Sequence, residues 1–147
     1  MLITKEIEID MAHRVCFHKS KCRNLHGHRY KIEAGVDDKV IQEEGRSDYW
    51  MVIDFWDLKQ ILIKEIDKKF DHWAIFYNKD VYRPLLEQMI NLQDQNPNKI
   101  HYVSFMPTAE NLCKFWFELL QPKLKEKGIK LAHIKIWETP TSTAIFT

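Results

Sequence analysis

Two segments near the start of the chain alternate between apolar and polar residues. A loop connects them, and histidines lie on both sides of that loop. The first covers residues 2–13 and ends in His13. The second covers residues 28–38, begins with His28 and follows His26 by two residues. A period of two is typical of β-strands, in which side chains two apart share one face of the sheet. An antiparallel pair of these strands would therefore bring three imidazoles together.

His13, His26 and His28 predict a catalytic metal site. Neutral imidazoles bind Zn²⁺, and a site with only three protein ligands leaves a fourth position open for water or substrate. Surface imidazoles on an edge strand, with no metal, are the plain alternative. A structural site built from Cys16 and Cys22 with His26 and His28 fits less well, because the spacing is not that of a zinc finger. A chain of 147 residues also needs no metal to build a core.

The loop between the two strands, residues 14–25, is rich in positive charge. Residues 11–32 contain no acid and six basic residues: Arg14, Lys19, Lys21, Arg23, Arg29 and Lys31. Such a cluster could hold an anionic substrate, since Lys and Arg bind phosphate, or it could be a solvated loop. Cys22 lies four residues before His26. Nearby cations and a metal would favour its thiolate, a base or nucleophile, although an inert loop cysteine is an equal alternative.

Three further groups could take part in chemistry. Asp71 and His72 follow a predicted helix, and a carboxylate can orient an imidazole for proton transfer, although this dipeptide also arises by chance. Glu138 follows an apolar strand and could accept paired hydrogen bonds from a guanidine-like ligand edge at the floor of a pocket. Glu110 is expected in the first turn of a helix that starts near Thr108, where an acid stabilises the helix end.

The rest of the chain predicts two main helices and two more strands. A helix should run from its N-cap Asp54 to about Lys69, with an apolar stripe interrupted by Glu65, and a second from Thr108 to 127. The other expected elements are a turn at 42–48, a short apolar piece at 50–53, a short helix at 80–92 with Pro84 in its first turn, a loop at 93–99, a strand or extended lead-in at 100–105, and strands at 131–137 and 141–146.

This order predicts one α+β domain over residues 1–147, with a four-stranded antiparallel sheet that carries both helices on one face. Joining sheets between subunits would be one way to protect its edges. The formal net charge of +1 gives no general case for nucleic acid or a membrane surface as partner, and no apolar run is long enough to cross a bilayer. Three irregularly spaced cysteines form no disulfide framework, so a reducing, cytoplasmic compartment is expected.

Six short motifs in order resemble those of the 6-pyruvoyl-tetrahydropterin synthase and 6-carboxytetrahydropterin synthase family, over nearly the whole chain. They are Met11-Ala12-His13, CRNLHGH at 22–28, MVIDFWDLK at 51–59, Asp71-His72, PTAENL at 107–112 and WET at 137–139. The resemblance implies a tunnelling fold, in which the sheets of neighbouring subunits join into a barrel, and a homohexamer of two stacked trimers.

The same resemblance implies roles for single residues. It assigns Zn²⁺ to His13, His26 and His28, proton transfer to Cys22, Asp71 and His72, and pterin recognition to Glu138 with Thr108 and Glu110 near the ring. The implied substrate is 7,8-dihydroneopterin triphosphate.

The position of Cys22, four residues before the first histidine of His-Gly-His, is similar to that in the bacterial carboxy-forming members. The resemblance therefore implies a lyase that forms 6-carboxy-5,6,7,8-tetrahydropterin, releases triphosphate and acetaldehyde, and serves 7-deazaguanine (queuosine-type) synthesis. Three alternatives stay open: a pyruvoyl-forming synthase, a pterin- or zinc-binding protein without turnover, and a metal-dependent hydrolase of another small molecule. The chain departs from compact bacterial members in two respects. Its segment 73–106 is longer, and the asparagine that usually follows Asp-His closely lies further along the chain, at Asn78.

Overall fold

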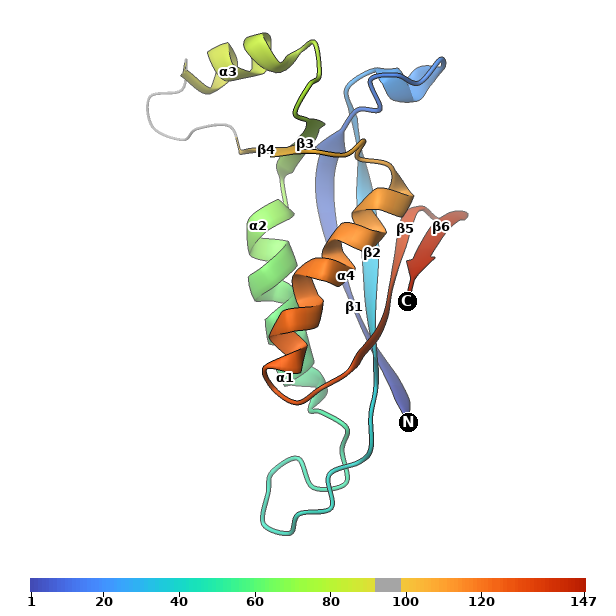
Figure 1. Ribbon diagram of the computed structural model, residues 1–147, viewed down its shortest axis with the longest axis vertical. Helices are drawn as coiled ribbons and strands as arrows, with labels where there is room; N and C mark the ends of the chain where they lie inside the picture. Colours follow the sequence, from blue (N-terminus) through green and yellow to red (C-terminus); the bar gives the residue numbers. More distant parts are fainter. Residues whose placement is uncertain (92–98) are drawn as a thin grey trace.

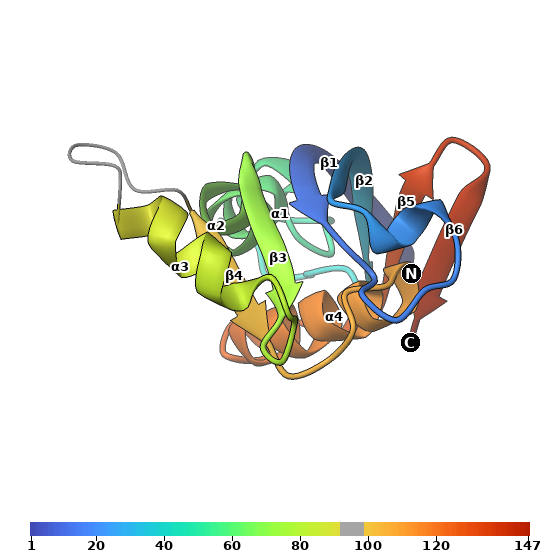
Figure 2. The ribbon, with the colours of Figure 1, turned by 90° about the horizontal axis from the view of Figure 1, so that it is seen from above.

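The computed structural model describes residues 1–91 and 99–147, in which one curled sheet wraps around two main helices (Figures 1 and 2). The strands of the described residues lie in the order β4-β3-β1-β2-β5-β6. They are β1 (Leu2–His13), β2 (His26–Asp37), β3 (Trp73–Tyr77), β4 (Ile100–Val103), β5 (Leu131–Thr139) and β6 (Ser142–Phe146).

The predicted pairing of β1 with β2 is confirmed, and it fixes the geometry of the site. The two strands are antiparallel along their whole length, with His13 opposite His26 and Met11 opposite His28. The face that carries Met11 and Tyr30 is buried against the helices, because apolar residues alternate with polar ones along both strands. β2 begins at His26, two residues before the expected start, so both histidines of the His-Gly-His motif belong to the strand.

The expected four-stranded antiparallel sheet is wrong, because β3 and β4 extend the sheet beyond β1. β3 runs parallel to β1, with Met11 opposite Trp73, and β4 runs parallel to β3. The segment Trp73–Tyr77 is a short apolar run without alternation, and such a run cannot be distinguished from a buried helix by its period. The fold is therefore α+β with a mixed sheet.

The first predicted helix is one helical run made of α1 (Phe55–Leu62), the π-helical turn η2 (Ile63–Asp67) and α2 (Lys68–Phe70). Asp54 caps it by accepting a hydrogen bond from the Trp56 N–H at 2.7 Å. The π turn contains Glu65, which is buried and accepts a hydrogen bond from Lys69 Nζ at 2.6 Å. The polar interruption of the apolar stripe thus coincides with a change in helix geometry.

The second main helix, α4 (Ala109–Lys125), follows its N-cap Thr108 and ends before Gly128, which has a φ of 74°. Figure 1 shows α4 in front of the sheet, and α4 contacts the first helical run at η2. A one-turn 3-10 helix, η1 (Lys21–Arg23), lies in the loop between β1 and β2. None of the helices in the described residues combines the length and apolar character that a membrane span requires.

The short helix α3 (Arg83–Asn91) confirms the prediction for this region, with Pro84 in its first turn, and it lies beyond the ends of the two main helices (Figure 1). The strand alternative at 100–105 is confirmed by β4. The predicted loop at 93–99 lies outside the described residues, apart from Lys99.

Candidate metal centre and the residues around it

His13, His26 and His28 converge at one end of the β1–β2 pair. One ring nitrogen from each lies within 4.8 Å of the others. The ring centroid of His13 lies 4.6 Å from that of His26 and 5.2 Å from that of His28. His13 is buried and the other two rings are half-buried. The sequence-based prediction that the three imidazoles meet is therefore confirmed, and the cluster could hold a metal ion.

The outer nitrogens of two of these rings are held by backbone carbonyl groups. His13 Nδ1 lies 2.7 Å from the Pro107 carbonyl oxygen, and His26 Nδ1 lies 2.8 Å from that of Asn24. A carbonyl only accepts, so Nδ1 carries the proton in each ring, and Nε2 of each neutral ring has a free lone pair. The two Nε2 atoms face each other at 3.1 Å. Two lone pairs at this distance repel unless a cation lies between them, so the donor set fits a metal.

The environment of His13 and His28 favours their neutral, metal-binding form. Burial lowers the pKa of His13 below its ordinary value, and the neighbouring His26 and His28 lower it further. Burial also lowers the pKa of His28. Both shifts disfavour the imidazolium, which cannot ligate a metal.

Glu138 and Tyr30 adjoin the triad on the same face of the sheet. Glu138 Oε1 lies 3.7 Å from His13 Nε2 and 3.4 Å from the Tyr30 hydroxyl oxygen. Burial raises the pKa of Tyr30, and the Glu138 carboxylate raises it further. Cys22 lies in η1 and is half-buried.

A cleft opens beside the triad because the β2–β5 ladder ends before either strand does. The last pair is Lys31 with Trp137, whereas β2 continues to His26 and β5 to Thr139. The cleft has a volume of about 590 Å³, and His28 and Glu138 both line it. Its size suits a drug-sized ligand, and its lining places a carboxylate next to the candidate metal ligands.

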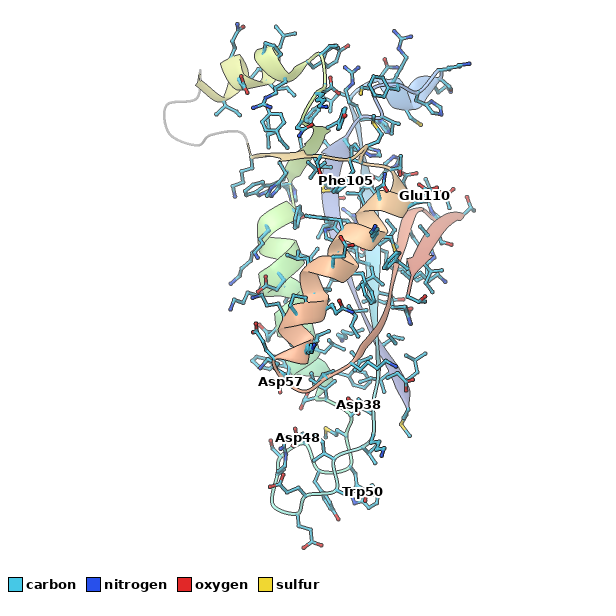
Figure 3. All side chains as sticks on the ribbon, viewed as in Figure 1. Asp38, Asp48, Trp50, Asp57, Phe105 and Glu110 are labelled. Carbon is cyan, nitrogen blue, oxygen red and sulfur yellow. The ribbon has the colours of Figure 1, made fainter. Side chains whose placement is uncertain are left out.

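The start of α4 is tied to the triad through Pro107, the residue before the helix cap. The Pro107 carbonyl accepts the His13 hydrogen bond, and the Thr108 hydroxyl accepts one from the Asn111 N–H at 3.5 Å. Glu110 lies at the N-terminal end of α4 and is exposed (Figure 3). The structure therefore places Thr108 one residue from a group that orients His13, and it places Glu110 in the first turn of α4, as predicted.

Asp71 and His72 form the predicted pair, with Asp71 Oδ2 2.7 Å from His72 Nδ1. The Asp10 N–H donates to Asp71 Oδ1 at 2.9 Å, and the His72 N–H donates to the Asp10 carbonyl at 2.7 Å. His72 has a φ of 59°, a left-handed conformation that is uncommon for residues other than glycine, and its side chain is 77% exposed. The pair is brought together, but no hydrogen bond joins it to the triad among the described residues.

His72 lines a second cavity, of about 520 Å³, with Asp10, Ala12, Arg29 and the triad member His28. The strand alternation puts the side chains of Asp10, Ala12 and Arg29 on the face opposite Tyr30. His72 thus lies beside residues of that other face, in a cavity that His28 of the triad also reaches.

The structure separates the predicted basic cluster into paired and exposed members. Arg29 forms two hydrogen bonds with the Asp10 carboxylate, at 3.0 and 2.9 Å, and Lys31 pairs with Glu6. The other exposed members are Lys19, Lys21 and Arg23. These three stay candidates for an anion site.

Sequence reasoning missed two groups next to the site. The Tyr30 hydroxyl contacts the triad, and its position two residues after His28 on an alternating strand was the signal that could have found it. Arg14, the residue after His13, is buried in an ion pair with Asp80, with Nε 3.1 Å from Oδ2. Asp80 lies at the start of the segment predicted as a short helix, and no pattern in the sequence pairs it with Arg14.

The family model described as 6-pyruvoyl tetrahydropterin synthase matches residues 2–147. The chain belongs to this family. Similar proteins include the 6-carboxy-5,6,7,8-tetrahydropterin synthase of Haemophilus influenzae, 36% identical over 140 residues that cover 95% of this chain and 94% of that protein. The enzyme of the same name from Rickettsia felis is 36% identical over 138 residues, covering 93% of each chain.

Solved structures share the family fold at lower identity. An uncharacterized protein from Wolinella succinogenes superposes with a TM-score of 0.81 at 22% identity, covering 99% of this chain and 97% of that one. The 6-pyruvoyl tetrahydropterin synthase of Caenorhabditis elegans gives a TM-score of 0.68 at 20% identity, covering 100% of this chain and 94% of that one. These likenesses concern the fold of the family.

Proposed function

We propose that this protein is a 6-carboxy-5,6,7,8-tetrahydropterin synthase, a lyase that converts 7,8-dihydroneopterin triphosphate and one water molecule to 6-carboxy-5,6,7,8-tetrahydropterin, triphosphate and acetaldehyde. Relatives of that name, 36% identical over most of the chain, support the proposal. The observation that carries it is the convergence of His13, His26 and His28 beside the cleft that contains Glu138.

The proposed metal is Zn²⁺, held by His13, His26 and His28. Three imidazoles, two of them with the outer nitrogen held by a backbone carbonyl, suit zinc, and a site with three protein ligands suits catalysis. When bound, the ion supplies Lewis acidity, which makes protons next to the substrate's side-chain hydroxyls easier to remove. The protein itself favours the neutral form of His13 and His28 and holds the three rings in a convergent arrangement.

The remaining site residues are proposed to bind the pterin and move protons. The Glu138 carboxylate would accept paired hydrogen bonds from the guanidine-like edge of the pterin, with Thr108 and Glu110 near the ring. Cys22, as a thiolate, would remove a carbon-bound proton. His72, held by Asp71, would return one. The exposed basic residues of the 14–25 loop would steady the triphosphate.

The proposed assembly is a homohexamer of two stacked trimers in which sheets join into a barrel. The edge strands β4 and β6 each pair on one side only among the described residues, which leaves edges available for joining. The exposed His72 side chain, which no hydrogen bond joins to the triad among the described residues, also suits an assembly in which a neighbouring copy completes the site. Cytoplasmic location and a place in 7-deazaguanine (queuosine-type) synthesis belong to the same proposal.

A pyruvoyl-forming synthase, which only eliminates triphosphate, is the second candidate, because the matching family model carries that description. Incubation of the zinc-loaded protein with 7,8-dihydroneopterin triphosphate, followed by an acetaldehyde assay, separates the two. The carboxy-forming reaction yields one acetaldehyde per triphosphate, whereas the pyruvoyl-forming reaction releases triphosphate without acetaldehyde. A protein that binds pterin and zinc but yields neither would be a binding protein and would contradict both candidates.

A further inference from the structure

The hydroxyl group of Tyr30 lies between a candidate metal ligand and the carboxylate proposed to hold the pterin. Its oxygen is 3.3 Å from His13 Nδ1, 3.4 Å from His13 Nε2 and 3.4 Å from Glu138 Oε1. The side chain of Tyr30 is completely buried. The proposed function leaves this hydroxyl without a role.

The direction of the Tyr30 hydrogen bond follows from counting protons. The His13 Nδ1 proton is directed to the Pro107 carbonyl at 2.7 Å, and His13 Nε2 faces His26 Nε2. Neither nitrogen of His13 therefore donates to Tyr30. The carboxylate of Glu138 is the charged acceptor within reach, so the single hydroxyl proton of Tyr30 goes to Glu138 Oε1.

The Tyr30 ring is held in place from three sides. It meets His13, His28 and Trp116 edge to face, with centroid distances of 5.9, 5.6 and 6.1 Å. Trp116 belongs to α4 and is itself completely buried. A ring packed in this way holds its hydroxyl at a fixed point relative to both histidines.

Glu138, by contrast, has little else to fix its carboxylate. Its side chain is 25% exposed, and it lies beyond Trp137, where the β2–β5 ladder ends. We propose that Tyr30 is a positioning residue: its hydroxyl holds Glu138 Oε1 at a set distance from His13, so that Oε2 stays directed to a ligand in the cleft. The inference rests on the proposed function, because it takes the ligand of Glu138 to be a pterin.

The test is a binding measurement on the zinc-loaded Tyr30→Phe protein, which keeps the ring and loses only the hydroxyl. The Kd for neopterin, an oxidised pterin that does not react, should rise about tenfold, the usual consequence of losing one hydrogen bond to a charged group. Zinc content and thermal midpoint should match those of the wild type. Tyr102→Phe is the matched control, because the Tyr102 hydroxyl is also buried but has no hydrogen-bond partner in the described structure.

A double-mutant cycle with Glu138→Gln separates positioning from packing. In the Glu138→Gln protein the charged acceptor is gone, so adding Tyr30→Phe should change the neopterin Kd and kcat/KM by less than about twofold. Equal effects of Tyr30→Phe in both backgrounds would overturn the inference, and so would a Tyr30→Phe protein that loses zinc or does not fold. If Glu138→Gln binds neopterin as tightly as the wild type, the proposed role of Glu138 fails instead.

Discussion

The Nε2 atoms of His13 and His26 face each other at 3.1 Å, while the outer nitrogen of each ring is held by a backbone carbonyl. Such a pair of lone pairs is stable when a cation occupies the space between them. The cluster is therefore organised so that it could hold a metal ion, with the strand register setting the distance and the carbonyls setting the tautomer.

Removal of one ligand should abolish the metal site. We expect one Zn²⁺ per chain in the wild type, and a fall in zinc affinity of roughly 100-fold or more in His26→Ala, since each ligand supplies a large share of the binding free energy. Elemental analysis after dialysis measures this. His18→Ala is the control, because His18 is exposed in the same loop and lies outside the triad. One retained zinc in His26→Ala would contradict the assignment.

The zinc-free protein should become less stable as the pH falls below about 6.5, the ordinary pKa of histidine. Burial lowers the pKa of His13 and of His28 in the folded state, so the unfolded chain takes up protons first. Stability is thus fully present above the unfolded pKa and is lost as the pH falls through the folded values. Urea unfolding at pH 8, 6.5 and 5.5 would show the trend. A His13→Gln/His28→Gln protein should show a shallower slope, and an equal slope would refute the explanation.

The two loop cysteines should respond differently to substitution. Cys22→Ala should lower kcat by about 10²- to 10⁴-fold, the usual contribution of a positioned base, with zinc content unchanged. Cys16→Ala should keep activity within about twofold, because burial and the charge of Asp80 raise the pKa of Cys16 and keep it a thiol. Activity and zinc content are measured together. A Cys22→Ala protein with normal turnover would refute the role of the thiolate.

The parts of the molecule set by local pattern could be predicted from the sequence. The alternation of residues 2–13 and 28–38 predicts the strand pair, and the pair brings His13, His26 and His28 together without any further information. The caps Asp54 and Thr108 likewise predict where both main helices begin.

The parts set by long-range contacts could not be predicted. β3 is a short apolar run whose partner, β1, lies some sixty residues earlier, and nothing local specifies a parallel edge strand. The position of the Asp71–His72 pair depends on the backbone of Asp10, which no pattern in the sequence identifies. The π turn at Glu65 depends on tertiary packing in the same way.

The left-handed conformation of His72 leads to a test that separates stability from activity. An L-residue with a side chain is strained at this φ of 59°, whereas glycine is not. His72→Gly should therefore be about 1 kcal/mol more stable than His72→Ala, the reverse of their order in a regular helix or strand. Both variants should lose activity equally, because both lack the imidazole. Urea unfolding and the acetaldehyde assay check the two expectations, and a more stable alanine variant would rule out the strain.

The buried ion pair between Arg14 and Asp80 should be needed for the fold next to the metal site. The side chains are 6% and 0% exposed, and the Arg14 guanidinium also lies 3.6 Å from the centre of the Tyr82 ring. Arg14→Met would leave the Asp80 carboxylate buried without its countercharge, at a cost of roughly 3–5 kcal/mol of unfolding free energy. Urea denaturation measures the loss. Lys114→Met is the control, since its pair with Glu118 is exposed and should contribute less than about 1 kcal/mol.

Adding Asp80→Asn to Arg14→Met tests whether the unpaired charge of Asp80 causes the loss of stability. The Asp80 Oδ1 atom accepts a hydrogen bond from the Tyr82 N–H at 2.8 Å, which an asparagine oxygen can also accept. Arg14→Met/Asp80→Asn therefore keeps this turn and removes the unpaired charge, so it should recover most of the stability lost in Arg14→Met. If the double variant is as unstable as Arg14→Met alone, the loss comes from the packing of Arg14 on Tyr82. In that case the ion pair contributes little, and the aromatic contact anchors the segment that follows β3.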